Sequence, residues 1–313
     1  MASGLMKGAD TAVRDCMNVK KGESVLILTD YEMDPEIPLA LMEAVKKVTK
    51  DVEIVSMRPL SRNGEEPDED IAKLMKSPDV LLVPTTKSLT HTKARRDAKK
   101  ACVRVATMPG IVRFSLEEGG LTADYGKVRK LCLRMRNAIY RGEEFRITTK
   151  KGTDLRMAFG DHIWDIDDGI YHNPGDFGNL PAGEVDTAPN EGTADGIIVF
   201  DTMDCYEKGI RMTVEDGFAV EIEGSKRLEE EVERLGKKVR NIAELGIGTN
   251  PQAKIIGNVL EDEKVYETVH VAIGNNVSFG GKCDVPFHID GIILKPTLEV
   301  DGKAIIKGGK WLV

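Results

Sequence analysis

The first 140 residues alternate between short apolar runs and stretches whose apolar residues recur at helical spacing. Apolar runs of four to eight residues are typical of buried strands, and a repeat of three or four positions is typical of helices that cover a sheet. We predict strands at 22–30, 51–59, 79–85 and 102–109, and helices at 35–50, 68–77, 90–101 and 123–140. Such regular alternation predicts a doubly wound parallel sheet with helices on its faces.

From about residue 143 the pattern becomes that of antiparallel strands. The segments 145–159 and 209–224 each contain two alternating runs around a turn, and Asp216-Gly217 is a strong hairpin signal. One helix is predicted at 225–241, with Ser225 as its N-cap. We therefore expect an α/β plus α+β protein with two domains. These are a Rossmann-like α/β domain at 1–142 and a β-rich domain at 143–313 that carries the chemistry.

Composition narrows the class of protein. Hydrophobic residues make up 41% of the 313 residues, enough for real cores, and the formal net charge is −8. An acidic chain is poorly suited to bind the phosphate backbone of nucleic acids. The N-terminus lacks the apolar run of a signal peptide, and no run approaches the ~18 apolar residues of a membrane span. Five scattered cysteines favour reduced thiols. We expect a cytoplasmic protein without nucleic-acid or membrane partners.

Several common catalytic motifs are absent from the sequence. The first predicted strand is not followed by GxGxxG, and no GxxxxGK[ST], HExxH or GxSxG occurs. Dinucleotide binding and serine catalysis therefore have little support.

Histidines mark a candidate site in the second domain. The chain has five histidines, and two of them, His270 and His288, lie in apolar, strand-like runs. His288 and Asp290 are two positions apart, so their side chains leave the same face of a strand with Cα atoms ~7 Å apart. Two imidazoles and a carboxylate are a known arrangement for iron, and zinc or cobalt use similar ligands. Taken singly, a histidine in a strand is more often a hydrogen-bonded core residue than a metal ligand.

Two glutamates extend this candidate site. Glu184 in GNLPAGEVDTAP and Glu244 in AELGIGTNP both occur in Gly- and Pro-containing turns that hold a side chain on a rigid loop. The alternative for each is a solvated loop carboxylate. Together with His270, His288 and Asp290, they form a set that suits two divalent ions ~3.5–4 Å apart.

Five segments, in this order, resemble the metallo-aminopeptidases of the aminopeptidase T and aminopeptidase S type. They are THTKARRDA with ATMPGI, then NLPAGEVDTAP, AELGIGTNP, EDEKVYETVHVAIG and FGGKCDVPFHID. The resemblance implies two zinc or cobalt ions held by Glu184, Glu244, His270, His288 and Asp290, and removal of N-terminal residues from peptides by a metal-activated water. It also implies a homodimer.

The sequence also departs from that family. The chain is shorter by roughly a hundred residues, and Val277 stands where the aminopeptidases carry a tyrosine seven residues after the first histidine. A second branch of the same fold contains the 2,5-dihydroxypyridine 5,6-dioxygenase, which uses one Fe(II) held by residues like His270, His288 and Asp290. Dioxygenase activity is therefore the alternative to peptidase activity.

Each hypothesis assigns roles to particular residues. In a peptidase, Glu184 would be the catalytic proton shuttle, and Asn275 and Asn276 would bind the substrate and its oxyanion. In a dioxygenase, Glu184 and Glu244 would be acid/base or structural groups. His91, at the entrance of a basic predicted helix, could contact substrate in either case. A third hypothesis treats the first domain as a binding module without catalysis.

Overall fold

The computed structural model describes residues 4–160, 163–203 and 206–313. The chain folds into two compact units. Unit 1 comprises Met1–Arg129, Asp167–Ala182 and Asn250–Lys254, and unit 2 comprises Lys130–Ile166, Gly183–Thr249 and Ile255–Val313. Compact units need not fold independently. The predicted division into domains 1–142 and 143–313 therefore stays a prediction.

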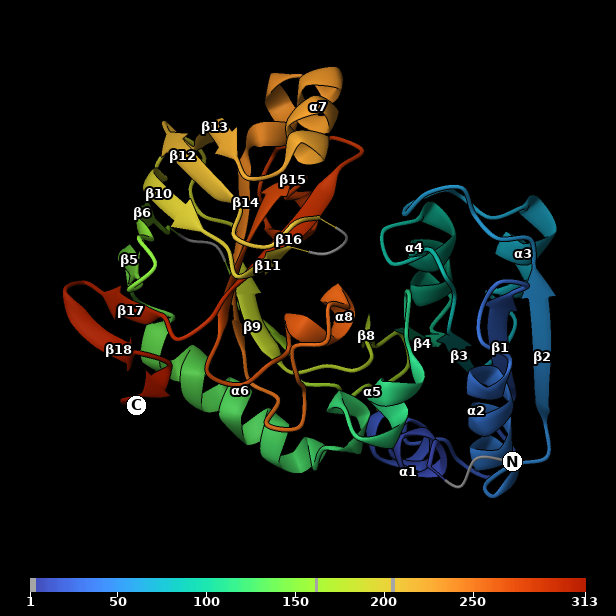
Figure 1. The fold of residues 1–313 in the computed structure, drawn as a ribbon. Coiled ribbons are helices and arrows are strands. Elements are labelled where there is room, and N and C mark those ends of the chain that lie inside the picture. The colour runs from blue at the N-terminus through green and yellow to red at the C-terminus, as the bar shows by residue number, and fades with distance from the viewer. Residues whose placement is uncertain (1–3, 161–162, 204–205) are drawn as a thin grey trace. The chain divides into compact units, whose positions relative to one another are not determined.

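Unit 1 is built on a parallel five-stranded sheet in the order β2-β1-β3-β4-β8 (Figure 1). Its strands are β1 (Val25–Asp30), β2 (Val52–Met57), β3 (Val80–Val83), β4 (Arg104–Thr107) and β8 (Phe177–Asn179). Its helices are α1 (Met6–Asp10), a π-helical turn (Thr11–Cys16), α2 (Glu36–Lys46), α3 (Glu69–Leu74), α4 (Lys93–Lys100), α5 (Arg113–Glu117) and a 3-10 turn (Gly120–Thr122). Helix α6 (Tyr125–Ile139) begins in unit 1 and continues into unit 2.

Apolar side chains fill the sheet of unit 1. All residues of β1, β3 and β4 are buried. Leu26, Leu81 and Val105 form one core with Ala94 and Ala98 of α4. The Thr92 hydroxyl caps α4 by accepting a hydrogen bond from the Arg95 backbone amide at 3.2 Å, which fixes where the helix begins.

The four strands and four helices predicted for this region are all present, with bounds that differ by a few residues. The prediction missed the fifth strand, β8, which pairs in parallel with β4. Its three residues, FGN, are too few to show an alternating pattern.

Unit 2 contains an antiparallel eight-stranded sheet in the order β13-β12-β10-β6-β5-β17-β18-β19 (Figure 1). Its strands are β5 (Glu144–Thr148), β6 (Asp154–Ala158), β10 (Asp195–Val199), β12 (Arg211–Glu215), β13 (Phe218–Glu223), β17 (Thr297–Val300), β18 (Lys303–Lys307) and β19 (Lys310–Trp311). Both predicted hairpins are present. Asp216 and Gly217 have φ of 48° and 79°, the left-handed conformations that this type of turn requires.

A second sheet of unit 2 has six strands in the order β11-β16-β15-β14-β9-β7. They are β7 (Asp165–Asp167), β9 (Glu184–Thr187), β11 (Thr202–Met203), β14 (Ile242–Gly248), β15 (Val269–Gly274) and β16 (His288–Ile293). The remaining elements are α7 (Lys226–Leu235), α8 (Val259–Asp262) and 3-10 turns at Lys237–Arg240 and Val277–Phe279. Ser225 caps α7 as predicted. The protein is therefore a mixed α/β protein with one parallel sheet and antiparallel sheets.

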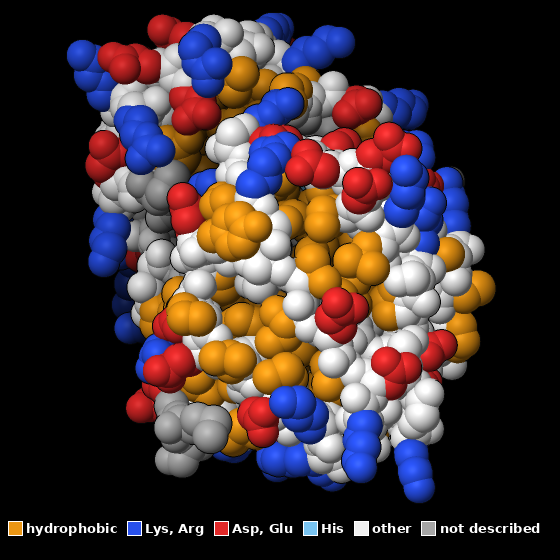
Figure 2. Space-filling view, turned by 90° about the vertical axis from the view of Figure 1, so that its right-hand side faces the viewer, with side chains coloured by type: hydrophobic (Ala, Val, Ile, Leu, Met, Phe, Trp, Pro, Cys, Tyr) orange, Lys and Arg blue, Asp and Glu red, His pale blue; other side chains and the backbone are white. Residues whose placement is uncertain are grey.

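Apolar side chains also reach the surface of unit 1. Strand β2 is an edge strand whose Val52, Ile54 and Val55 are half-buried, and Leu39 of α2 is exposed. Figure 2 shows that apolar side chains gather on the side of unit 1 that carries these two elements. Among the described residues, no helix combines the length and apolar character needed to cross a bilayer.

Candidate metal centre

Four adjacent strands of the six-stranded sheet bring the five predicted ligands together. Glu184 lies on β9, Glu244 on β14, His270 on β15, and His288 and Asp290 on β16. Side chains two positions apart share a face of a strand, and directly paired residues share a face of the sheet. The register pairs Glu244 with Ala272 and Ala272 with Asp290, so these carboxylates lie on the same face as His270. The alternation predicted for His270 and Ala272 is therefore realised.

A glycine lies opposite three of the candidate ligands on one neighbouring strand, which leaves room for the ligand side chains. His270 is paired with Gly246, His288 with Gly274, and Glu184 with Gly248. A Cβ added at Gly246 would lie 2.0 Å from the Nε2 atom of His270, so no larger residue fits there without displacing the imidazole. The glycines in AELGIGTNP thus have a positional role, as spacers on the face that carries the ligands.

The donor atoms of the cluster converge. His270 Nε2 lies 3.4 Å from Glu184 Oε2 and 3.4 Å from Glu244 Oε1. His288 Nε2 lies 3.3 Å from Glu244 Oε2 and 3.4 Å from Asp290 Oδ2. One ligand atom from each of Glu244, His270 and Asp290 lies within 4.8 Å of the others, and all three residues are buried. The five residues form one cluster, as the sequence predicted. The rigid loops predicted for Glu184 and Glu244 are wrong, because both residues lie in fully buried strands.

These separations fit a shared cation better than a set of ion pairs. Charge-assisted N–H···O bonds are typically about 2.7–2.9 Å long, clearly shorter than the distances here. Two ligand atoms at about 2.1 Å from one ion, at the tetrahedral angle, lie about 3.4 Å apart. The imidazole and carboxylate atoms therefore stand at the spacing that common coordination to a metal would produce.

The surroundings of His288 direct one ring nitrogen into the cluster. Its Nδ1 lies 2.8 Å from the Asn275 carbonyl oxygen, an acceptor that favours a proton on Nδ1. The lone pair of Nε2 is then free to bind a metal. The Phe279 ring stacks on the imidazole with centroids 5.3 Å apart and so limits its rotation. Support of this kind is typical of metal-binding histidines.

The electrostatics of the cluster show that it requires positive charge. Burial alone would lower the pKa of His270, but Glu244, Glu184 and Asp290 outweigh it and raise this pKa to about 9. The pKa of His288 is likewise raised, by Asp290 and Glu244 against the effect of burial. Without a metal, protons on the imidazoles balance the carboxylates. Metals bind neutral imidazole, so a divalent ion would release these protons and supply the charge instead.

Sequence reasoning missed three ionisable residues at this cluster. Lys264 has a completely buried side chain that forms ion pairs with Glu184 and, at 2.8 Å, with Glu263. Burial raises the pKa of Glu263 to about 8, and burial together with Glu244 and Glu184 raises that of Asp186 well above its usual value. Asp186 was detectable, because it stands two positions after Glu184 on the same strand face. Lys264 was not, because it lies in the segment between α8 and β15.

The other predicted site residues have different surroundings. The Asn275 amide donates to Asp284 Oδ1 at 3.1 Å and to the Val285 carbonyl at 3.0 Å, while its own backbone carbonyl contacts His288. Asn276 is buried, and its side chain contacts Glu191 and the Cys283 backbone amide. These contacts organise the loop around His288, and substrate binding by either asparagine stays a prediction.

His91 and Val277 were also singled out from the sequence. His91 is exposed in a turn of unit 1 just before α4, and its contact with substrate stays a prediction. Val277, at the position of the aminopeptidase tyrosine, is 50% exposed in the 3-10 turn that follows β15.

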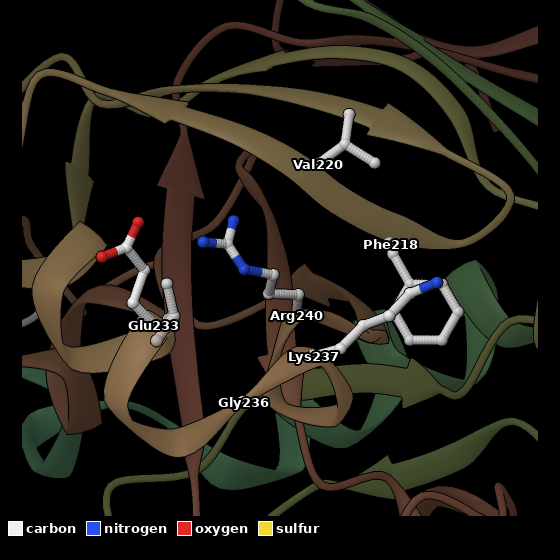
Figure 3. A pocket seen from close by; sticks show the side chains of 7 residues that line it. Phe218, Val220, Glu233, Gly236, Lys237 and Arg240 are labelled. Carbon is white, nitrogen blue, oxygen red and sulfur yellow. The ribbon is translucent and has the colours of Figure 1, made fainter.

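A separate pocket of unit 2 lies away from these ligands. It has a volume of about 360 Å³ and opens between β13 and the turn after α7 (Figure 3). The lining residues are Phe218, Val220, Val232, Glu233, Gly236, Lys237 and Arg240. The ammonium of Lys237 lies 5.1 Å from the centre of the Phe218 ring, and Arg240 donates to the Ala219 carbonyl. None of the described ligand candidates lines it.

The sequence is similar to that of a known enzyme family. Residues 7–313 match the family model described as 2,5-dihydroxypyridine 5,6-dioxygenase. A protein of that name from Pseudomonas putida is 23% identical over 93% of this chain and 91% of its own length.

Two solved structures share the fold. The 2,5-dihydroxypyridine dioxygenase of Pseudomonas putida KT2440 aligns with a TM-score of 0.82 and 18% identity, covering 100% of this chain and 99% of that one. AmpT from Thermus thermophilus aligns with a TM-score of 0.67 and 19% identity, covering 99% of both chains.

These findings correct the main functional prediction from the sequence. The aminopeptidase interpretation, with its classification as a hydrolase and protease, is wrong, because the family model and the curated relative both name a dioxygenase. The ligand motifs belong to a fold that both branches share, which is why they pointed to the aminopeptidases. Val277 and the shorter chain were the better guides. The match over nearly the whole chain shows that the protein belongs to the 2,5-dihydroxypyridine 5,6-dioxygenase family of enzymes.

Proposed function

We propose that this protein is a ring-cleaving dioxygenase that uses one Fe(II) and acts on a dihydroxylated pyridine. The observation that carries the proposal is the family match over residues 7–313, which includes every residue of the histidine–carboxylate cluster. The residue types in the cluster support it, because His270, His288 and Asp290 supply the two histidines and one carboxylate that are characteristic of Fe(II) oxygenases. The ligand atoms that lie within 4.8 Å of one another belong to Glu244, His270 and Asp290. Only one ion is needed for this chemistry, in place of the two predicted for a peptidase.

Fe(II) would be held by the Nε2 atoms of His270 and His288 and by a carboxylate oxygen of Asp290. When bound, it would supply open positions and the redox chemistry by which O₂ attacks an aromatic ring, which no side chain can provide. The protein fixes the ligands on two neighbouring strands, so their relative positions are set by the backbone hydrogen bonds of β15 and β16. Rigid placement lowers the cost of organising the centre.

Glu244 is our candidate for moving the proton of a ring hydroxyl. Its two oxygens lie 3.4 Å from His270 Nε2 and 3.3 Å from His288 Nε2, so the carboxylate borders both histidine ligands. In the metal-free cluster, burial raises the pKa of Glu244, but hydrogen bonds from His270 and His288 outweigh it and lower this pKa. With those nitrogens on Fe(II), the charge of the ion would keep the Glu244 carboxylate ionised and able to accept a proton. A deprotonated ring hydroxyl is more electron-rich and reacts more readily with O₂.

The test is oxygen consumption by reconstituted protein. Metal-free protein is loaded anaerobically with Fe²⁺ and mixed with 2,5-dihydroxypyridine in aerated buffer, and O₂ is followed with an electrode. We expect one O₂ to be consumed per substrate molecule, with loss of the aromatic absorbance. The matched control is the same protein loaded with Zn²⁺, which cannot activate O₂ and should consume none. Iron-loaded protein that leaves both O₂ and the ring intact would contradict the proposal.

The predicted homodimer also stays a proposal. Light scattering coupled to gel filtration would measure the mass of the particle, and a mass near 34.4 kDa would contradict it.

A further inference from the structure

A completely buried ammonium group lies beside the metal cluster. The side chain of Lys264 has no exposed surface, and Nζ contacts Glu184 Oε1 and lies 2.8 Å from Glu263 Oε1. A buried lysine is costly unless its charge is paired and hydrogen-bonded. The ammonium is therefore held by these two carboxylates, and they in turn depend on its charge.

The backbone around Lys264 holds the side chain in this position. The residue follows α8, and its amide donates to the Glu261 carbonyl at 3.2 Å. The backbone of this segment lies directly against β14, because a Cβ added at Gly248 would come within 2.0 Å of the Val265 carbonyl oxygen. Gly248 is also the residue paired with Glu184. The segment thus reaches Glu184 across a position where only glycine fits.

Glu184 connects the ammonium to the metal cluster. One oxygen contacts Lys264, while the other, Oε2, is buried 3.4 Å from His270 Nε2 and has no hydrogen-bond partner. In the two-ion centre expected from the resemblance to the aminopeptidases, Glu184 is one of the five ligands. Here the positive charge that touches Glu184 is an amino group of the protein itself.

We propose that the Lys264 ammonium takes the place of a second divalent ion and so limits this centre to one metal. An ammonium and a divalent cation repel each other strongly in a buried site. A second ion bound at either oxygen of Glu184 would therefore be opposed by the charge of Lys264. Lys264 is a positioning residue: it neutralises Glu184 and Glu263 and keeps Glu184 from serving as a ligand. This inference deepens the proposed function, which requires a single ion, but it concerns metal stoichiometry and not turnover.

The first test counts Co²⁺ ions bound by metal-free protein without substrate, by isothermal titration and by elemental analysis after gel filtration. We expect one Co²⁺ per chain in the wild type. Lys264→Met removes the charge at similar length and should admit a second Co²⁺ between Glu184 and Glu263, which raises the count to two. Lys264→Arg is the matched control, because it keeps the charge and should bind one.

The same measurement can overturn the inference in two ways. Two Co²⁺ ions bound tightly by the wild type would show that Lys264 does not exclude a second ion. A folded Lys264→Met variant that still binds one Co²⁺, with unchanged affinity, would show that the ammonium has no influence on metal number.

A further variant keeps the inference testable if Lys264→Met does not fold. Glu184→Gln should keep one Co²⁺ per chain and weaken its binding by about 10–100-fold at most, the effect of losing a group that supports a ligand. Asp290→Asn removes a ligand and should lose far more affinity. If the Glu184→Gln variant lost Co²⁺ binding as completely as the Asp290→Asn variant, Glu184 would be a ligand and the inference would be overturned.

Both tests are independent of the dioxygenase reaction. If the Co²⁺ counts are as expected but no ring is cleaved, the proposed function is contradicted and the role of Lys264 stands. If the ring is cleaved but the Co²⁺ counts differ from those expected, the role of Lys264 is contradicted and the proposed function stands.

Discussion

Two sets of fully buried strands in this protein have opposite chemistry. In unit 1, strands β1 and β3 read VLILTD and VLLV, so both faces of the sheet are almost entirely apolar. In unit 2, strands β14 and β15 are just as buried but read IAELGIG and VHVAIG, with a glutamate and a histidine on one face. Equal burial therefore does not mean an equal contribution to stability.

The difference shows how a buried polar face is tolerated. Ionisable groups taken out of water need partners of opposite charge. On the polar face of unit 2, the imidazoles and Lys264 are the partners of the carboxylates. Small residues such as Gly246 leave space for the ligand side chains. The sheet of unit 1 stabilises the fold by burying apolar surface, whereas the polar face of unit 2 provides function at some cost in stability.

Removing a ligand should have the largest effect. We expect His288→Ala to lower ring-cleaving activity by at least about 100-fold, because even loss of a group that supports a ligand costs 10–100-fold. Metal binding, measured by titration of the metal-free protein, should weaken in parallel. His172→Ala is the control, because this exposed histidine of unit 1 contacts the Asp15 carbonyl through its ring and should leave both values unchanged. Normal iron content in His288→Ala would remove His288 from the ligand set.

Removing a core side chain of unit 1 should affect stability instead of chemistry. Leu81 is fully buried in β3, and Leu81→Ala should lower the free energy of unfolding by about 2–5 kcal/mol. Activity per folded molecule should stay at the wild-type level. Leu39→Ala, on the exposed side of α2, should change stability by less than about 0.5 kcal/mol. Chemical denaturation measures both variants, and equal effects at the two positions would contradict the assignment of Leu81 to the core.

Filling the space opposite His270 should reduce metal affinity. In Gly246→Ala the new Cβ would lie 2.0 Å from His270 Nε2, so the imidazole must move. We expect metal binding to weaken by about 10–100-fold, the effect of disturbing the support of a ligand. Gly126→Ala serves as the control, since its nearest neighbour is the flexible Asp124 carboxylate at 3.2 Å. Unchanged affinity in Gly246→Ala would mean that His270 is not a ligand in its present orientation.

A surface carboxylate of unit 1 should give the smallest effect, with a defined pH dependence. Asp79 accepts hydrogen bonds from the Ser24 amide and hydroxyl at 2.8 and 2.9 Å, which lower its pKa. A lowered folded pKa means that the stabilisation is present above the unfolded pKa of about 3.9 and is lost as the pH falls through the folded value. Because Asp79 is exposed, Asp79→Asn should cost less than about 1 kcal/mol at pH 7.

Thermal unfolding of wild type and Asp79→Asn at several pH values would measure this difference. It should shrink below pH 4, and a difference that grew towards acid pH would have the wrong sign.

Much of the fold was predictable because local patterns agree with the tertiary structure. The strands and helices of unit 1 follow from apolar runs and helical spacing, and the Asp216-Gly217 hairpin and the Ser225 cap follow from local backbone preferences. The spacing of His288 and Asp290 on one strand face was also predictable, whereas their role as metal ligands stays a prediction. The reaction class was not, because two enzyme branches share these motifs and differ in what surrounds them.

The sequence by itself determined the alternation of elements and the turn types, because each depends on neighbours a few positions apart. Only the tertiary structure placed the Lys264 ammonium on Glu184, 80 residues earlier in the chain, and stacked the Phe279 ring on His288. It also revealed that Gly246 is a spacer for an imidazole on the adjacent strand. Such contacts arise from packing between segments that are distant in the chain. A local repeat of apolar and polar residues does not determine which acidic and basic side chains will pair.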